Sequence, residues 1–306
     1  MTEITATLVK TLRERTRAGV IDCKKALVET DGDLEAAVDR LRAAETANAA
    51  SKADRVAAEG LVGLVVEGTT GAIVELNTET DFVARTEGFR STAAALASIA
   101  LRVQGDYGRL LNAPAPGEEG CVSDAIARLT MRTGERVHLR RSAFVAVNPG
   151  VIASYVHNAA APGVGSIGVL VALESRGEPG PLLAIGHKIA MHVAASAPLW
   201  VQQEDIPADV VAQKRAELTE LARQTGKPPE IVTKMVEGRM RKFYEEVVLT
   251  AQPFVLNPDQ RVGQALKDAE DAAGVAVAIR AFVRFRTGEG IEKRVEMNDL
   301  LRQAMR

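Results

Sequence analysis

The chain has 306 residues, with 38 lysines and arginines against 40 aspartates and glutamates, so its formal net charge is −2. A near-neutral chain argues against a nucleic-acid binder that works by neutralising phosphates, because such proteins usually carry a strong basic excess. Aromatic residues make up only 4% of the chain and leave few surfaces for stacking bases. At this length we expect roughly two domains of about 100–200 residues.

The N-terminal segment 1–54 is predicted to be a three-helix module followed by a linker. Leu8 and Leu12 share a face of the first helix, which we expect to end at Gly19. Asp22 and Asp33 stand where N-caps of the second and third helices would be. The segment 43–53 is predicted to be a linker or a loosely tethered helix. So small a bundle resembles ubiquitin-associated modules, which mostly dock other proteins.

The middle of the chain shows one order of elements twice, which predicts an α+β core of two related halves, 55–148 and 149–290. Each half is expected to place helices on one face of a small antiparallel sheet. The first pass has strands at 60–67, 72–77 and 136–147, with helices at 87–103 and, capped by Ser123, up to 132. The second pass has strands at 151–157, 166–174 and 275–286, with a helix at 182–195.

An inserted helical hairpin is predicted within 197–250, with arms at 207–225 and 228–248. The Gly-Lys-Pro-Pro run at 226–229 suits its turn, because glycine ends helices and proline begins them. We expect its seam to contain Leu218, Leu221, Ala222, Ile231, Met235 and Val247. The last segment, 291–306, is predicted to be an amphipathic C-terminal helix.

Targeting and membrane signals are absent from the sequence pattern. Cys23 and Cys121 are too isolated for a disulfide framework or a zinc knuckle, and the charged first twenty residues exclude a secretory signal. Residues 142–173 contain no Asp, Glu, Lys or Arg, yet prolines, asparagines and glycines interrupt them, so we predict strands and loops rather than a membrane span. We expect a cytoplasmic protein.

Several motifs are typical of chemistry but are better explained by structure. Gly163, Gly165 and Gly168 form G-x-G-x-x-G, but a strand-like run follows where a dinucleotide fingerprint needs a helix. His187 and His192 are five residues apart, which separates them by roughly 140° around a helix and spoils a shared metal face. We therefore predict a strand-connecting turn and two helix histidines, with one partly packed. No cofactor and no metal site is expected.

Two further polar clusters leave alternatives open. The basic run Arg136, His138, Arg140 and Arg141 alternates along a predicted strand and is interpreted as a solvated face. The run 78–85, Thr-Glu-Thr-Asp-Phe-Val-Ala-Arg, follows a strand. From the residues alone we favour the interpretation in which Thr78 or Thr80 caps a helix and Phe82 staples it to the core. The alternative is that Phe82 is an exposed aromatic anchor of the kind that dominates interfaces.

The sequence resembles bacterial translation elongation factor Ts in runs spread over most of its length. The matching runs are Glu-Ile-Thr-Ala at 3–6, Asp-Cys-Lys-Lys-Ala-Leu at 22–27, Thr-Asp-Phe-Val-Ala at 80–84, Ala-Met-His-Val-Ala-Ala-Ser at 190–196, Met-Val-Glu-Gly-Arg-Met at 235–240 and Gly-Glu-Gly-Ile-Glu-Lys at 288–293. The resemblance implies an exchange factor that performs no covalent chemistry. Its partner would be elongation factor Tu, GDP-bound or nucleotide-free, and it would need no direct contact with nucleic acid or membrane.

The resemblance also implies which residues act. Thr80, Asp81, Phe82 and Val83 would displace Mg²⁺ from the partner, with Phe82 as the wedge. Arg13, Val20 and Ile21 would contact the partner's nucleotide-binding domain, with Val20 and Ile21 standing where methionines are common. His157 matches a contact histidine, although Asn158 stands where glycine usually follows it.

Two rival functions are open alternatives. One is a passive protein that holds the GTPase without releasing nucleotide, and the other is an enzyme that uses the glycine-rich turn to bind a dinucleotide. In the family the hairpin is a variable protrusion that can support self-association, so a homodimer or a heterotetramer is an open alternative to a one-to-one complex.

Overall fold

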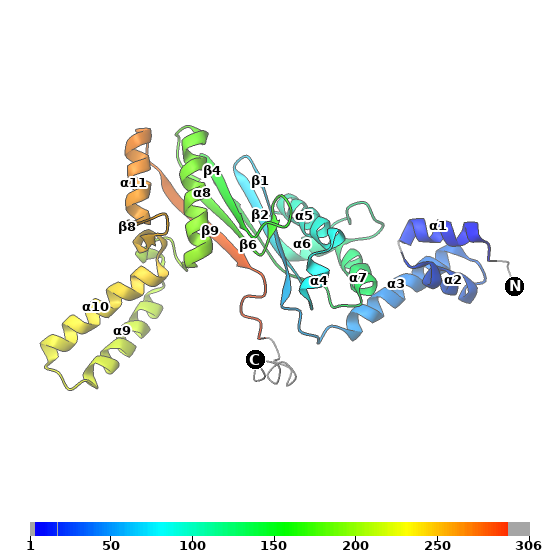
Figure 1. Ribbon diagram of the computed structural model, residues 1–306, viewed down its shortest axis with the longest axis horizontal. Coiled ribbons are helices and arrows are strands. Elements are labelled where there is room, and N and C mark those ends of the chain that lie inside the picture. The colour runs from blue at the N-terminus through cyan, green and yellow to red at the C-terminus, as the bar shows by residue number, and fades with distance from the viewer. Residues whose placement is uncertain (1–3, 17, 293–306) are drawn as a thin grey trace, which may run out of the picture.

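The computed structural model of the protein describes residues 4–16 and 18–292. A three-helix module lies at one end, two sheets with their covering helices form the centre, and a helical hairpin projects at the other end (Figure 1). Helices combine with antiparallel sheets throughout, which confirms the predicted α+β class. Among the described residues, no helix combines the length and the apolar character needed to cross a membrane.

The N-terminal module consists of α1 (Ala6–Thr16), α2 (Val20–Glu29) and α3 (Leu34–Ser51). Its helices enclose a small core of their own, in which the buried side chains are Leu12, Ala18, Cys23, Ala26, Leu27, Ala37, Val38 and Leu41. Cys23 is thus a packing residue, and burial raises the pKa of its thiol.

Two boundary predictions in this module are wrong and one is confirmed. α1 ends at Thr16, and Gly19 instead takes the N-cap position of α2. Asp22 lies inside the first turn of α2, where its charge complements the helix dipole without capping the helix. The Asp33 carboxylate does cap α3, because it accepts a hydrogen bond from the Ala36 amide at 3.1 Å.

The segment 43–53, predicted as a linker or a tethered helix, is mostly helical and extends α3 to Ser51. It is held in place because α3 packs along α7 (Val122–Thr133) of the core. Lys52 Nζ donates a hydrogen bond to the Thr130 carbonyl of α7 at 3.4 Å. A packed helix, rather than a free linker, therefore joins the module to the core.

The first half of the core follows the predicted order of strands and helices. Its elements are β1 (Glu59–Glu67), β2 (Thr70–Thr78), α4 (Asp81–Ala84), α5 (Glu87–Arg102), α6 (Tyr107–Asn112), α7 and β3 (His138–Ala146). The predicted Ser123 cap is wrong: the N-cap position of α7 is two residues earlier, at Cys121. Asp124 closes this end, because its carboxylate accepts from the Cys121 amide at 2.9 Å.

The second half contains the predicted strands and helices together with elements that the sequence pattern did not predict. Its main elements are β4 (Gly150–His157), β5 (Val164–Gly165), β6 (Ile167–Glu174), α8 (Pro179–Ser196) and β9 (Ala278–Arg286). Between α8 and β9 lie η1 (Gln203–Asp205), α9 (Ala208–Arg223), α10 (Pro229–Val247), η2 (Leu249–Ala251), β7 (Pro253–Phe254), β8 (Asn257–Arg261) and α11 (Val262–Ala273). The elements that the sequence pattern did not predict are the short strand β5, the single-turn helices η1 and η2, the β7–β8 hairpin and α11.

The two halves repeat one topology. The strand orders β3-β2-β1 and β4-β6-β9 are both antiparallel, with the second strand of each half in the middle and β5 added at the edge of the first sheet. A bulge interrupts the pairing of the second and third strands in both halves. Gly60 and Gly150 lie at the starts of β1 and β4, as the second and the first residue, with φ of +139° and +155°, and a Cβ at either would lie 2.1 Å from a carbonyl oxygen. The repeat predicted from the sequence therefore extends to matching bulges and glycines.

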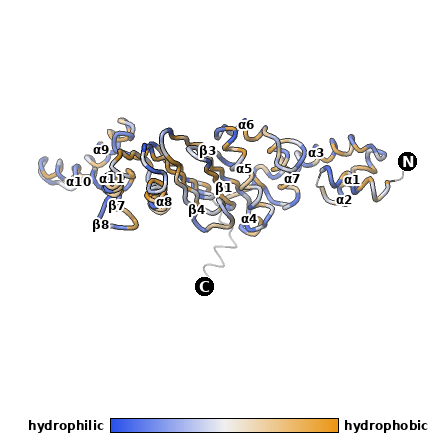
Figure 2. Tube along the Cα trace, turned by 90° about the horizontal axis from the view of Figure 1, so that it is seen from above, coloured by the Kyte–Doolittle hydropathy of each residue, from blue (hydrophilic) through white to orange (hydrophobic). Residues whose placement is uncertain are grey.

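The two sheets pack face to face, and one helix covers each outer face (Figure 1). The shared layer between the sheets is apolar and includes Val62, Leu64, Ile73, Ile152, Leu170 and Phe285. α5 covers the outer face of the first sheet and α8 that of the second. Hydrophobic residues accordingly predominate along the central strands (Figure 2).

A buried acid ties the end of β9 to the first sheet. Glu75 on β2 is fully buried and accepts hydrogen bonds from Arg140 Nη1 at 3.0 Å, Arg141 Nε at 2.5 Å and the Gly288 amide at 2.8 Å. The predicted solvated face is thus wrong for Arg140 and Arg141, whose charges compensate a buried carboxylate. Arg141 also lies over the Phe285 ring, 4.2 Å from its centroid.

The helical hairpin of α9 and α10 is confirmed, but part of its predicted seam is not. The buried seam consists of Leu218, Ala222, Val232, Val236 and Met240. Leu221 and Ile231, which we predicted in the seam, are 44% and 45% exposed. The sequence periodicity places the buried face of α10 one residue before the position that the structure shows. The predicted helix 291–306 lies outside the described residues except for Ile291 and Glu292, which are not helical.

The contact between α3 and α7 buries an acid that is only partly compensated. Glu45 on α3 is 3% exposed, and its Oε1 has no hydrogen-bond partner within 4–16 and 18–292. Burial raises the pKa of Glu45 to about 7, an effect that outweighs the nearby positive charge of Arg128. Glu45 is therefore largely protonated in the folded protein below neutral pH.

We predict that the stability of the protein falls between about pH 4.5 and pH 7 because of Glu45. Above about pH 4.5 the Glu45 carboxyl keeps its proton in the folded protein but loses it in the unfolded chain. The free energy of unfolding therefore falls by about 1.4 kcal/mol for each pH unit until the pH passes the pKa of Glu45 in the folded state. Urea unfolding from pH 5 to pH 8 should show wild type losing roughly 2–3 kcal/mol relative to Glu45→Gln. Glu67→Gln, at an exposed acid, should leave the pH profile unchanged. Parallel profiles for wild type and Glu45→Gln would contradict the assignment.

Candidate functional site

Phe82 is the most unusual exposed side chain of the core. It lies on the four-residue helix α4 directly after β2, and it is 79% exposed. The interpretation in which Phe82 staples a helix to the core is therefore wrong. Thr80 occupies the N-cap position of α4, but its side chain makes no capping hydrogen bond. The exposure that the alternative interpretation requires of Phe82 is observed, whereas its role as an interface anchor stays a prediction.

The loop before Phe82 is held by a residue that the sequence reasoning missed. Glu135, just after α7, accepts hydrogen bonds from the Thr80 amide at 3.0 Å, the Thr80 hydroxyl at 2.5 Å and the Thr78 hydroxyl at 2.8 Å. In return, the Glu79 carboxylate accepts from the Arg136 amide at 2.5 Å. The only sequence signal was the helix-ending Gly134 before Glu135, which does not specify a partner 55 residues away.

The residues around Phe82 differ in exposure. Asp81 and Val83 are partly exposed, and Ala84 is buried against the core. Arg85 pairs with the Asp81 carboxylate at 2.6 Å within one turn of helix. Phe82 thus stands on a short polar support with an acid beside it.

Arg13, Val20 and Ile21 lie on the surface of the N-terminal module. Val20 is 53% exposed and Ile21 is 82% exposed, although both belong to a short helix whose opposite face is buried. Arg13 and Val20 line a shallow hollow of about 410 Å³ together with Val9, Lys10 and Lys24. An apolar patch rimmed by basic side chains is a suitable surface for another protein.

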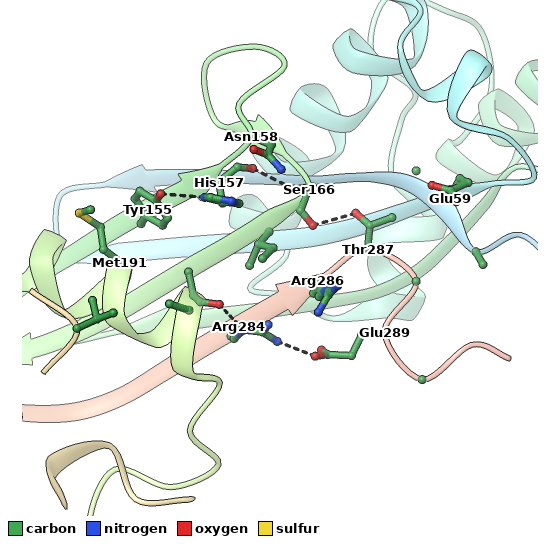
Figure 3. Close-up of a pocket in the computed structure, with 18 residues that line it drawn as sticks. Glu59, Tyr155, His157, Asn158, Ser166, Met191, Arg284, Arg286, Thr287 and Glu289 are labelled. Carbon is green, nitrogen blue, oxygen red and sulfur yellow. Dashed lines mark hydrogen bonds and ion pairs between the residues drawn. The ribbon is translucent and has the colours of Figure 1, made fainter. Parts of the chain in front are cut away.

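His157 lies at the end of β4, on the rim of a groove of about 990 Å³ (Figure 3). Its Nδ1 is 3.1 Å from the Tyr155 hydroxyl. Arg284 and Glu289, which form an ion pair at 2.7 Å, line the same groove. Asn158 has φ +49°, a left-handed conformation that glycine adopts freely and asparagine tolerates. The Asn158 substitution therefore preserves a turn of the kind that glycine would make.

The structure does not gather the predicted residues into one pocket. The module surface lies at one end of the molecule, α4 lies near its centre, and the groove at His157 involves the second sheet (Figures 1 and 3). Such an arrangement suits a large partner that is contacted at several places, rather than a small substrate.

The sequence motifs set aside as structural have structural roles. After Gly163 and Gly165 comes strand β6, with no helix N-terminus to hold a phosphate. His192 is buried, and its ring lies between Gln252 Oε1 at 2.8 Å and the Val255 amide at 3.1 Å. Burial lowers the pKa of His192, so the ring is held neutral. Across the described ranges, no three His, Cys, Asp or Glu side chains are grouped to hold a metal ion.

Comparisons with known proteins all indicate the same protein family, and the similar proteins align with nearly the whole chain. Residues 79–289 match the family described as Elongation factor TS. A protein named Elongation factor Ts from Parvibaculum lavamentivorans is 50% identical over 293 residues, covering 96% of this chain and 95% of that protein. Proteins of the same name from Rhodospirillum rubrum and Agrobacterium fabrum are 50% and 49% identical, again over 96% of this chain and 95% of theirs.

Proposed function

The chain belongs to the elongation factor Ts family, a nucleotide-exchange family of translation elongation, and on this premise we propose how it acts. It binds elongation factor Tu loaded with GDP, disturbs the Mg²⁺ and nucleotide site, and so releases GDP to let GTP enter. It is an exchange factor and catalyses no covalent reaction of its own. The single observation that carries this proposal is the exposed Phe82 on its short helix within the family-matched region.

The physical requirement for exchange is a difference in binding between two states of the partner. GDP and Mg²⁺ hold each other on a GTPase because the cation neutralises phosphate charge. A factor that binds the empty state more tightly than the loaded state must weaken nucleotide by the same coupling free energy. A 10⁴-fold effect needs about 5.5 kcal/mol of such difference.

Thr80, Asp81, Phe82 and Val83 are the proposed means of creating that difference. An aromatic side chain that inserts only when the Mg²⁺ site has opened contributes to the empty state alone, and such anchors are commonly worth about 2–4 kcal/mol. The neighbouring Asp81 carboxylate adds negative charge, which would compete with phosphate and the acidic Mg²⁺ ligands for cations. The exposure of Phe82 supports this role, since a side chain already packed in its own core could not insert elsewhere.

Arg13, Val20, Ile21 and His157 are proposed to hold the partner without acting on the nucleotide directly. Their separation along the molecule would place the partner against the module, α4 and the second half together (Figure 1). The hairpin of α9 and α10 lies at the opposite end from the module. Its role in a homodimer, a heterotetramer or a one-to-one complex is decided by light scattering of the protein alone and with its partner.

We expect Phe82→Ala to slow GDP release from elongation factor Tu by about 30-fold or more relative to wild type, because losing the anchor removes about 2 kcal/mol or more. Stopped-flow release of fluorescent GDP measures this directly. The fold should be unaffected, since Phe82 is mostly solvent-exposed. Leu183→Ala, at an exposed leucine of α8, is the matched control and should match wild type. Wild-type rates for a folded Phe82→Ala would refute the wedge role.

The same assay separates the rival functions. A passive holder would bind the partner and leave the GDP release rate unchanged even with wild-type protein. An enzyme using the glycine-rich turn would bind a dinucleotide by itself, which equilibrium dialysis with NAD would detect.

For a substitution on the surface of the N-terminal module, we predict weaker binding to the partner and an unchanged rate of GDP release at saturation. Ile21→Ala removes an apolar contact that should be the same in the loaded and empty states of the partner, so it acts as uniform binding. The concentration of factor giving half-maximal GDP release should rise about tenfold, while the rate at saturation stays near wild type. If the saturating rate fell as it does in Phe82→Ala, Ile21 would belong to the exchange machinery instead.

A further inference from the structure

We infer that Glu135 is a positioning residue that sets the direction of Phe82, an inference that rests on the proposed function. Glu135 belongs to the turn after α7, and it is remote in sequence from α4. Its carboxylate accepts three hydrogen bonds from Thr78 and Thr80, the two threonines that precede α4. The contact with the Thr80 amide fixes the backbone two residues before Phe82.

α4 needs such outside support because it is very short. A four-residue helix has almost no stability of its own, since helix nucleation is unfavourable. Its N-cap threonine does not cap it, because the Thr80 hydroxyl is donated to Glu135 instead. The backbone entering α4 is therefore fixed by Glu135 rather than by local helix signals.

Phe82 cannot supply the missing support itself. At 79% exposure it has little packing that could hold its direction, whereas a buried aromatic is held by its neighbours. Charge-assisted hydrogen bonds to a carboxylate are about twice as strong as neutral ones and constrain direction. Three of them at the base of the loop make the placement of Phe82 depend on Glu135.

A second carboxylate, in the segment before α4, accepts a hydrogen bond from the segment that contains Glu135. Glu79, between the two threonines, accepts from the Arg136 amide at 2.5 Å and from Arg55 Nη1 at 3.4 Å. The segments 78–80 and 135–136 thus hold each other through two carboxylates. Loss of Glu135 leaves the Glu79 contacts in place, so the loop should be loosened rather than unfolded.

The test is a double-mutant cycle between Glu135→Ala and Phe82→Ala, measured by stopped-flow GDP release from elongation factor Tu. Glu135→Ala alone should lower the saturating release rate by about tenfold and by no more than Phe82→Ala does, as expected for the misplacement of an acting group. In the Phe82→Ala background it should change the rate by less than twofold, because its effect passes through Phe82. An equal loss in both backgrounds overturns the inference.

Three further variants separate positioning from general destabilisation. Glu135→Gln retains an oxygen acceptor and should restore part of the lost rate. Glu67→Ala removes an exposed acid from the far end of β1 and should behave as wild type. If Glu135→Ala does not fold, Thr80→Val removes only the hydroxyl donor and should give a smaller loss, again only when Phe82 is present. A wild-type rate for a folded Thr80→Val together with full additivity in Glu135→Gln would overturn the inference.

Hydrogen exchange of the free protein keeps this test independent of the proposed function. Peptides covering 78–84 should exchange at least tenfold faster in Glu135→Ala than in wild type, while peptides of α5 stay unchanged. Unchanged exchange at 78–84 refutes the positioning role. A wild-type protein that fails to accelerate GDP release refutes the proposed function and leaves the exchange result standing.

Discussion

The face-to-face packing of two small sheets is the constraint on which the rest of the structure depends. A single three- or four-stranded sheet covered by one helix leaves its other face exposed, and each half of this chain resolves that by covering the other. This packing also removes polar groups at the edge of the contact from water, which costs free energy. Glu75 is buried there and is compensated by Arg140 and Arg141. The two arginines also donate to the Glu289 and Arg286 carbonyls, and so help to fix where the chain leaves β9.

This architecture separates residues that hold the structure from residues free to bind. Apolar side chains occupy the layers between sheets and helices, so the strand ends and short connecting helices carry the exposed groups. Phe82 is the extreme case, because it is an aromatic residue whose surroundings are polar and whose support comes from carboxylates. In the proposed function, directional hydrogen bonds to the loop before Phe82 would preorganise this exposed side chain for a partner without burying it in the free protein.

Much of this fold follows from sequence patterns, and the exceptions have physical reasons. The repeated order of strands and helices was predictable because period and turn residues are local signals. Ile231 was misplaced because a one-residue error in helical phase rotates the buried stripe of α10 by about 100°, whereas Leu221 lies beside the correctly predicted Leu218 and Ala222 of α9, outside the narrow buried stripe. Phe82 as an exposed residue could only be left as an alternative, since exposure depends on what packs around it. Glu135 was missed because its partners lie 55 and 57 residues away.

In the proposed function, contacts that are far apart on this protein act on one nucleotide site of the partner. Long-range action does not require motion within this protein if its parts are rigidly joined, because a rigid body bound at one place presents its other surfaces at fixed positions. The module is joined to the core by the packed α3–α7 contact, and α7 leads directly into the turn that holds the Phe82 loop. Binding at Ile21 would then raise the effective concentration of Phe82 at its target, in the manner of two linked binding sites. The packing of α3 against α7 and the hydrogen bonds of Glu135 would then together set the position of Phe82 relative to the module.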